Sequence, residues 1–319
     1  MIIDRATAEE NLITPRDFIR WGASLMGEAE QQDQIYFGHG TDNAVDESVQ
    51  LVLNGLHLPS DCPDLLLEGN LLQTERQHLV KLFARRVEDR VPLPYLTNRA
   101  MFAGLQFYVD ERVLVPRSPV AELIEQQFSP WINPEVPDHI LEIGAGSACI
   151  AIACAYEFPE ATIDAVDLSE DALKVAEINV EQHGLEDQVN LIRSDLFSEL
   201  DGKRYDLIVT NPPYVDKLDL DSMPAEFHAE PRMGLEAGED GLDIVVQILL
   251  ESSAHLEENG ALVCEVGNSA LALEQLFPEV PWSWIDFERG GHGVFVIGHD
   301  LLDRYRPLFR KEFERRAVP

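Results

Sequence analysis

The residues with the clearest chemical meaning are Asn211-Pro212-Pro213-Tyr214, which follow an apolar run predicted to be a strand over 207–210. Two prolines fix the backbone and remove two N–H donors. The side-chain carbonyl of Asn211 and the backbone carbonyl of Pro212 are then fixed acceptors that suit a substrate –NH2 group, and Tyr214 can pack against its flat carrier. Because ligands of open α/β sheets bind at the carboxyl ends of strands, this pattern favours a substrate site over a simple proline-rich turn. We predict Asn211, Pro212, Pro213 and Tyr214 as substrate-binding residues, and Asn211, Pro212 and Tyr214 as catalytic ones.

A glycine-containing loop, Glu142-Ile143-Gly144-Ala145-Gly146-Ser147-Ala148, separates a predicted strand over 140–143 from a predicted helix over 148–157. Glycines at 144 and 146 allow a tight turn and a close approach of the backbone to a ligand. A plain strand-to-helix turn is the alternative. Since Ala148 stands where a dinucleotide-binding loop has its third glycine, a nucleoside-type ligand is favoured over a pyrophosphate.

Two aspartates follow the next two predicted strands, over 162–166 and 189–193. The carboxylate of Asp167 can accept both hydroxyls of a ribose. A helix cap is its alternative role, although Ser169 is better placed to cap the helix that follows. The carboxylate of Asp195 can accept from an adenine amino group, with Leu196 beside the ring, while turn formation explains Asp195 taken by itself equally well. Together the two aspartates predict a nucleoside pocket.

From residue 139 onward the sequence alternates apolar strands with helices, which is typical of a parallel sheet covered on both faces. The last two predicted strands are joined by residues 289–293, which are too few for a helical crossover, so we expect them to pair antiparallel. Further strands are predicted over 261–266, 282–287 and 294–297, and further helices over 170–182, 240–257 and 270–277.

The N-terminal part has a different pattern, with helical spacing of apolar residues over 14–25, 46–53 and 73–91. Residues 100–115 change to the period of a two-stranded hairpin, and a helix is expected from Val120 to about Phe128. We therefore predict a helical domain over 1–95, a β-hairpin linker over 96–119, and the sheet-containing domain over 120–319.

Composition limits the partners, because 24 Lys and Arg against 58 Asp and Glu give a net charge of −34. Such a chain is repelled by bare phosphate backbones and anionic lipids, so DNA, free RNA and membranes are expected to be poor partners and a basic protein a good one. The 4 cysteines form no C-x-x-C pair, so neither a metal site nor a disulfide framework is expected. With no signal-peptide pattern and no apolar run near the roughly 20 residues that span a bilayer, we expect a cytoplasmic protein.

The glycine loop, Asp167, Asp195 and Asn-Pro-Pro-Tyr together resemble the S-adenosylmethionine-dependent methyltransferases that modify a planar amide or amine nitrogen. Further motifs resemble the protein-(glutamine-N5) methyltransferases of the HemK/PrmB type, over nearly the whole chain. These motifs are Phe102-x-Gly104, Phe107-x-Val109, Val113-Leu114-Val115-Pro116-Arg117 and Glu230-Pro231.

Two stretches distinguish branches of that family. Release-factor enzymes usually continue Pro-Arg with Pro-Glu-Thr-Glu, whereas this chain has Ser118-Pro119-Val120-Ala121-Glu122, which resembles the PrmB branch acting on the third protein of the large ribosomal subunit. The stretch from Tyr36 to Asn43 resembles the same branch. Two departures are mild: Ala148 replaces the usual glycine, and Glu142 stands where aspartate is common.

The resemblance implies a seven-stranded Rossmann-like class I methyltransferase sheet with an antiparallel last strand. It implies N5-methylation of a glutamine side chain in a basic ribosomal protein that docks on the helical domain, with no metal. S-adenosyl-L-methionine would be contacted by Glu142, Gly144, Gly146, Ala148, Asp167, Asp195, Leu196 and Asn211.

Other interpretations stay open at this point. A release-factor glutamine methyltransferase shares the chemistry, and a DNA amino-methyltransferase uses a similar motif on a flipped base, although it needs a basic face that −34 disfavours. A nicotinamide oxidoreductase leaves Asn-Pro-Pro-Tyr unexplained, and a non-catalytic ribosome-assembly binder would tolerate loss of the cofactor carboxylates. Residues 238–241 either shape the substrate entrance or form a solvated loop. The basic segment 304–316 either caps the fold or touches ribosomal RNA.

Overall fold

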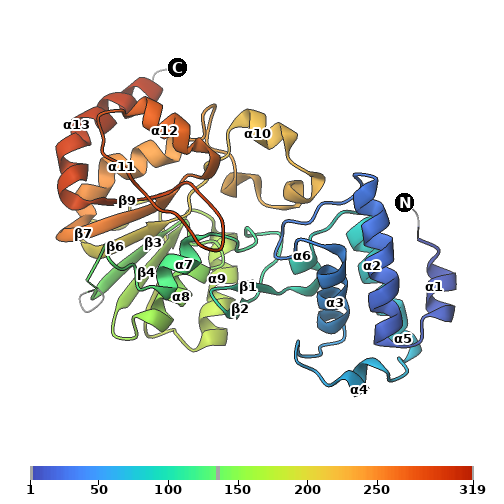
Figure 1. The fold of residues 1–319 in the computed structure, drawn as a ribbon. Helices are drawn as coiled ribbons and strands as arrows, with labels where there is room; N and C mark the ends of the chain where they lie inside the picture. The colour runs from blue at the N-terminus through green and yellow to red at the C-terminus, as the bar shows by residue number, and fades with distance from the viewer. Residues whose placement is uncertain (1–2, 134–136, 318–319) are drawn as a thin grey trace. The chain divides into compact units, whose positions relative to one another are not determined.

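The computed structural model describes residues 3–133 and 137–317 of the chain, apart from the side chain of Leu218. The chain folds into two compact units (Figure 1). The helical unit comprises residues 1–100, 109–111 and 223–230, and the sheet unit comprises residues 101–108, 112–222 and 231–319.

The sheet unit is built on a seven-stranded sheet with the order β5-β4-β3-β6-β7-β9-β8. Neighbouring strands from β5 to β7 pair parallel, whereas β9 pairs antiparallel with both β7 and β8. The predicted fold class, including the antiparallel last strand, is confirmed. The strands are β3 (His139–Ile143), β4 (Thr162–Asp167), β5 (Val189–Arg193), β6 (Tyr205–Thr210), β7 (Leu256–Glu265), β8 (Ser283–Trp284) and β9 (Val294–Gly298).

Helices cover both faces of this sheet, because successive side chains of a buried parallel strand point to opposite faces and both must be shielded from water. Along β3, Ile140 packs in one core with residues of α7, α8 and α9, and the next residue, Leu141, packs in the other with residues of α11, α12 and α13. Figure 1 shows these two sets of helices on either side of the sheet. The helices are α7 (Val120–Glu125), α8 (Cys149–Glu157), α9 (Glu170–His183), α10 (Lys217–Ser222), α11 (Asp243–His255), α12 (Ala270–Leu276) and α13 (His299–Arg316).

The helical unit contains α1 to α6. Thr14 caps α2 by accepting from the Asp17 N–H, and Pro15 occupies the first helical position, as the sequence predicts. The helices are α1 (Arg5–Asn11), α2 (Pro15–Gln31), α3 (Ala44–Gly55), α4 (Asp64–Leu67), α5 (Gln73–Val87) and α6 (Leu93–Thr97).

A buried ion-pair network holds a distant segment in the helical unit. Arg86, which is 2% exposed, pairs with Glu47 and lies 3.2 Å from Glu226, a residue of the short 3-10 turn at Ala225–Ala229. Arg90 pairs with the other oxygen of Glu226 at 2.6 Å. Removing charges from water is costly unless they are paired, so these contacts explain why residues 223–230 fold with α5 rather than with their sequence neighbours.

Several predicted elements are shorter in the structure: the helix predicted over 73–91 ends at Val87, and the one predicted over 240–257 covers Asp243–His255. The hairpin is limited to β1 (Ala100–Phe102) and β2 (Leu105–Phe107), the helix after it ends at Glu125, and β8 covers only Ser283–Trp284. The C-terminal segment forms α13, which buries Leu302 and Phe309 and therefore caps the fold as an amphipathic helix. No helix within the described ranges is long and apolar enough to cross a membrane.

Candidate active site at the carboxyl ends of four strands

The predicted functional residues meet at one edge of the sheet. Since β5, β4, β3 and β6 are consecutive parallel neighbours, the segments that follow them lie side by side in that order. Ile143 at the end of β3 is in register with Val166 of β4 and with Thr210 of β6. The chain runs from β3 through β4 to β5 and then crosses to β6 on the other side of β3, so the direction in which strands are added reverses between β3 and β6. Ligands bind at such a point in folds of this kind.

The glycine loop adopts the backbone conformation that such a turn needs. Gly144 and Gly146 have φ values of +75° and +54°, and Ala148 has φ +60°. A left-handed conformation costs a residue with a Cβ roughly 1–2 kcal/mol, and Ala148 adopts it in spite of that cost. Space beside Gly146 is open, because a Cβ built there would meet nothing within 4 Å.

Asp167 connects this loop to β4. Its carboxylate accepts the Gly146 N–H and the Ser169 N–H, both at 2.8 Å. Ser169 caps α9 with its own hydroxyl, so capping is not the main role of Asp167. Burial raises the pKa of Asp167, while its hydrogen bonds to backbone N–H groups oppose that shift. A carboxylate has about four lone-pair positions, so Asp167 keeps acceptors for a ligand.

Glu142 is more deeply placed than Asp167. Its side chain is 2% exposed and accepts the Ala151 N–H in the first turn of α8 at 2.9 Å. Burial, with added repulsion from Asp167, raises the pKa of Glu142 well above its ordinary range. The geometry gives Glu142 a direct role in ordering the loop and the start of α8.

Asp195 lies exposed after β5, and within the described ranges no hydrogen bond of its carboxylate is found in the turn there. Ser194 Oγ donates to the Leu196 carbonyl at 2.7 Å, and Ser198 Oγ accepts the Asp195 N–H at 3.2 Å. Leu196 has φ +48°, which is unusual for a leucine. Since strained backbone concentrates at functional sites, this conformation agrees with a ligand-facing role for Asp195 and Leu196.

The Asn211-Pro212-Pro213-Tyr214 segment continues from β6, whose last residue, Thr210, donates its hydroxyl to the Ile143 carbonyl at 2.9 Å. This bond ties the motif to the glycine loop. Asn211 is partly exposed, and no hydrogen bond of its side chain is found in the described part of the chain. The amide of Asn211 is thus available to a ligand.

Tyr214, in contrast, is firmly held. Its hydroxyl donates to Glu265 Oε1 at 2.7 Å, and its ring packs so closely on Gly267 that a Cβ there would lie 2.5 Å from a ring carbon. The other oxygen of Glu265 accepts the Ser118 hydroxyl at 2.5 Å. Burial raises the pKa of Glu265, with these hydrogen bonds opposing it. Ser118 and Tyr214, from two sequence motifs, therefore share one buried carboxylate.

The donors and acceptors at this edge fit S-adenosyl-L-methionine. Carboxylate oxygens such as those of Asp167 and Asp195 are the acceptors that ribose hydroxyls and an adenine amino group need, and the backbone at Gly146 borders open space. Leu168, next to Asp167, is half exposed although it is apolar. Among the described residues no cluster of His, Cys, Asp and Glu is arranged to hold a metal ion.

Comparisons with known proteins agree with this geometry. A "methyltransferase small domain" family model matches residues 130–281. The chain is 46% identical over 307 residues to the ribosomal protein uL3 glutamine methyltransferase of Francisella tularensis, covering 96% of both chains. It is 47% identical over 293 residues to the protein of the same name from Xanthomonas campestris, covering 92% of this chain and 93% of that one. The chain belongs to the protein glutamine methyltransferase family.

The predicted family, the enzyme class and the methyl donor, S-adenosyl-L-methionine, are thereby confirmed. A solved methyltransferase structure from Pyrococcus furiosus is also similar, with 19% identity, a TM-score of 0.44, and coverage of 61% of this chain and 89% of that chain. The roles of individual residues remain predictions.

Sequence reasoning missed three contributors to this edge: Glu265, Ser269 and Gly267. Glu265 ends β7 like an ordinary strand residue, and its partner Ser118 is 147 positions away. Ser269 donates to the Tyr214 carbonyl at 2.9 Å.

His292, predicted to lie in a hairpin turn, is exposed between β8 and β9, and its Nε2 is 3.1 Å from Asn268 Oδ1.

Proposed function

We propose that this protein methylates the N5 amide nitrogen of a glutamine in ribosomal protein uL3, using S-adenosyl-L-methionine. The observation that carries the proposal is the Asn-Pro-Pro-Tyr segment, which follows β6 directly beside the glycine loop and the two aspartates. Relatives 46% and 47% identical, bearing the uL3 glutamine methyltransferase name, support the choice of substrate.

The cofactor would be held by the backbone at Gly144 and Gly146, by Asp167 on the ribose and by Asp195 with Leu196 on the adenine. Glu142 and Ala148 would shape the loop. When bound, S-adenosyl-L-methionine supplies a methyl group activated by its sulfonium.

The amide nitrogen of glutamine is a poor nucleophile because its lone pair is delocalised into the carbonyl. We propose that Asn211 Oδ1 and the Pro212 carbonyl accept its two hydrogens, which orients the nitrogen and stabilises the positive charge that develops on it. Tyr214, held by Glu265 at 2.7 Å, and Pro213 would support the planar amide. Fixed acceptors of this kind need no reorganisation during the reaction.

The expected partner is basic and cytoplasmic. Ribosomal proteins bind RNA through positive charge, and a chain with a net charge of −34 attracts them while repelling DNA and anionic membranes. We propose that the helical unit docks this substrate. Its α4 region exposes the large apolar side chains of Leu65, Leu66 and Leu72, which is unusual for a surface without a partner.

Methyl transfer from labelled S-adenosyl-L-methionine tests this function, with purified uL3, a peptide release factor and naked DNA as parallel substrates. We expect label on a glutamine of uL3, located by mass spectrometry. Asn211→Ala should lower kcat by about 10²- to 10³-fold, as for the loss of one preorganised transition-state contact.

Asn190→Ala is the matched control, because Asn190 lies at the edge strand β5 and donates to Asp164 at 3.0 Å. It should keep wild-type kcat. Label on the release factor alone would retain the chemistry and reject uL3, and label on DNA would reject both. Cofactor binding without any transfer would favour the assembly-binder interpretation.

A further inference from the structure

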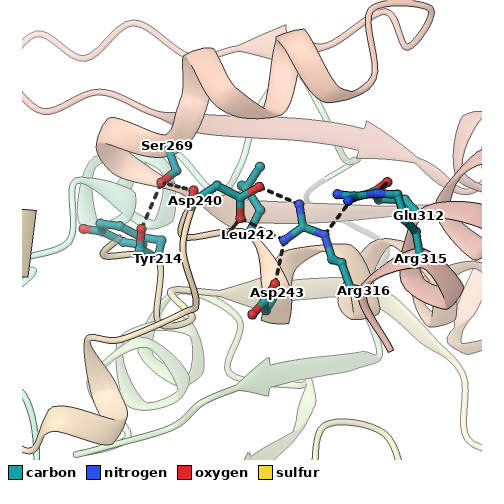
Figure 2. A network of polar contacts seen from close by, with 8 residues as sticks. All are labelled: Tyr214, Asp240, Leu242, Asp243, Ser269, Glu312, Arg315 and Arg316. Carbon is teal, nitrogen blue, oxygen red and sulfur yellow. Dashed lines mark hydrogen bonds and ion pairs between the residues drawn. The ribbon is translucent and has the colours of Figure 1, made fainter. Parts of the chain in front are cut away.

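The C-terminal end of α13 carries Arg316, whose guanidinium pairs with three carboxylates. The guanidinium of Arg316 contacts both carboxylate oxygens of Asp240, at 2.8 and 2.6 Å. It also contacts Asp243 Oδ1 at 2.6 Å and Glu312 Oε1 at 2.8 Å (Figure 2). Its side chain is only 14% exposed, whereas that of neighbouring Arg315 is 67% exposed and pairs with Glu312 alone among the described residues.

Electrostatics favour this arrangement in the folded protein. The hydrogen bonds from Arg316 hold the pKa of Asp240 below its ordinary value, and those same bonds raise the pKa of Arg316. A bidentate arginine–carboxylate pair also fixes the orientation of both planar groups. Arg316 therefore holds Asp240 and Asp243 in place, and Asp240 belongs to residues 238–241, for which the sequence left open a solvated loop.

The loop in turn contacts the backbone of the Asn-Pro-Pro-Tyr segment. Ser269 Oγ lies 2.9 Å from the Tyr214 carbonyl and 3.1 Å from the Asp240 carbonyl, so one hydroxyl links the two backbones (Figure 2). Gly241, at φ +74°, comes so near that a Cβ there would be 2.2 Å from the Tyr214 carbonyl oxygen. Only a glycine allows this approach.

We propose that Arg316 is a positioning residue for methyl transfer, acting through Asp240 and Ser269 on the backbone that carries Asn211 and Pro212. The proposal rests on the proposed function for its activity readout. In it, the last turn of α13 fixes the acceptors of the reaction without touching the substrate. The proposal gives this role to Arg316 alone and not to the other basic residues of 304–316.

The test compares Arg316→Met with Arg315→Met, which removes the same charge from the adjacent residue. Arg316→Met should lower kcat by about tenfold or more, since a misplacement of about 1 Å caused by a distant mutation can cost about 10²-fold. The dissociation constant of S-adenosyl-L-methionine, measured by calorimetry, should stay near that of the wild type. Arg316→Lys should recover part of the loss, because one ammonium can satisfy one carboxylate but cannot pair in bidentate fashion.

Hydrogen exchange gives a readout that does not depend on activity. The Val215 N–H bonds to the Leu235 carbonyl at 2.9 Å, and the Leu242 N–H to Asp240 Oδ1 at 3.2 Å. Both amides should exchange faster in Arg316→Met and at the wild-type rate in Arg315→Met. Ser269→Ala breaks the same link from the other end and should speed exchange at Val215 with the ion pairs intact, which keeps the proposal testable if Arg316→Met does not fold.

Faster exchange confined to the end of α13, with unchanged kcat, would overturn the proposal. An equal loss of kcat in Arg315→Met would also overturn it, because general charge rather than the Asp240 link would then be responsible. If the wild-type protein methylates none of the substrates offered, the proposed function fails, and the exchange rates at Val215 still decide whether Arg316 fixes this loop.

Discussion

At the scale of single residues, three carboxylates at the active edge, two buried and one partly buried, differ in their partners. Asp167 accepts from backbone N–H groups of the glycine loop and of Ser169, Glu142 from the first turn of α8, and Glu265 from two hydroxyls. Burial raises the pKa of all three. Because each carboxylate accepts hydrogen bonds from fixed donors, the fold can keep these acidic groups away from water.

The pKa of Glu142 leads to a prediction about pH and stability. A carboxyl group whose pKa is raised in the folded state binds protons more tightly there than in the unfolded chain, so stability falls as pH rises from the ordinary value of 4.5 through the raised one. Glu142→Gln removes this cost while keeping an acceptor for the Ala151 N–H. The difference in the free energy of unfolding, variant minus wild type, should therefore be more positive at about pH 8 than at about pH 5, which means that the variant is relatively more stable at the higher pH.

Chemical denaturation of the cofactor-free protein at both pH values measures this difference. Glu160→Gln, at an exposed position before β4, is the control and should show no such trend. If the stability of Glu142→Gln relative to the wild type is the same at both pH values, the pKa of Glu142 is not raised in the folded protein.

The sequence was most informative about residues whose position in the fold is set by the strand next to them in the chain. The positions of Asn211, Asp167 and Asp195 at one edge of the sheet were predictable because each stands at or just after the end of a strand, and parallel strands bring their ends to one edge. Glu265 was not, since its role comes from Ser118 and Tyr214, 147 and 51 positions away. Side chains that join distant segments leave no local signal.

At the scale of elements, the alternation of apolar residues predicted burial better than strand pairing. Val109, Val113 and Val115 are almost completely buried, yet none belongs to a strand in the structure. Period-two spacing indicates one buried face, and the burial of these three side chains agrees with that, although no strand is assigned to them. The strands of the large sheet were predicted well because they are buried on both faces and bounded by turns.

The turn after β7 gives a prediction at this scale. Gly267 has φ +47°, and a Cβ there would meet the Tyr214 ring. Gly267→Ala should therefore displace Tyr214 and lower kcat, in addition to destabilising the fold by about 1–3 kcal/mol through overpacking. Steady-state methylation and denaturant unfolding measure the two effects separately.

Gly184→Ala is the matched control, because Gly184 has φ +66° at the end of α9 but open space around its Cβ position. It should lose about 1–2 kcal/mol through the left-handed backbone alone and keep its kcat. A wild-type kcat in Gly267→Ala would show that methyl transfer does not depend on the present position of the Tyr214 ring.

At the scale of the whole molecule, the helical unit is not a contiguous N-terminal segment. Residues 223–230 belong to it, through Glu226 with Arg86 and Arg90. Deleting residues 1–90 to test substrate docking would leave Glu226 buried without its arginines, at a cost of several kcal/mol. Such a deletion would confound docking with misfolding, so substitutions at the exposed Leu65 and Leu72 are the sharper test of docking.

The charge of the whole chain gives the last prediction. With a net charge of −34, long-range attraction should speed the encounter with a basic ribosomal protein, and salt screens that attraction because the Debye length is about 10 Å at 0.1 M and about 3 Å at 1 M. Raising NaCl from about 50 to about 500 mM should therefore increase the KM for uL3 about tenfold or more and leave kcat nearly constant.

A short, uncharged peptide containing the modified glutamine is the control substrate, since it gains nothing from long-range attraction. Its KM should change by less than about twofold over the same range of salt, because only contacts made within the site remain. Equal salt dependence for the peptide and for uL3 would place the effect on cofactor binding or on the chemical step. A KM for uL3 that does not respond to salt would mean that recognition rests on apolar contacts such as those of the exposed leucines around α4, with the acidic surface serving another purpose.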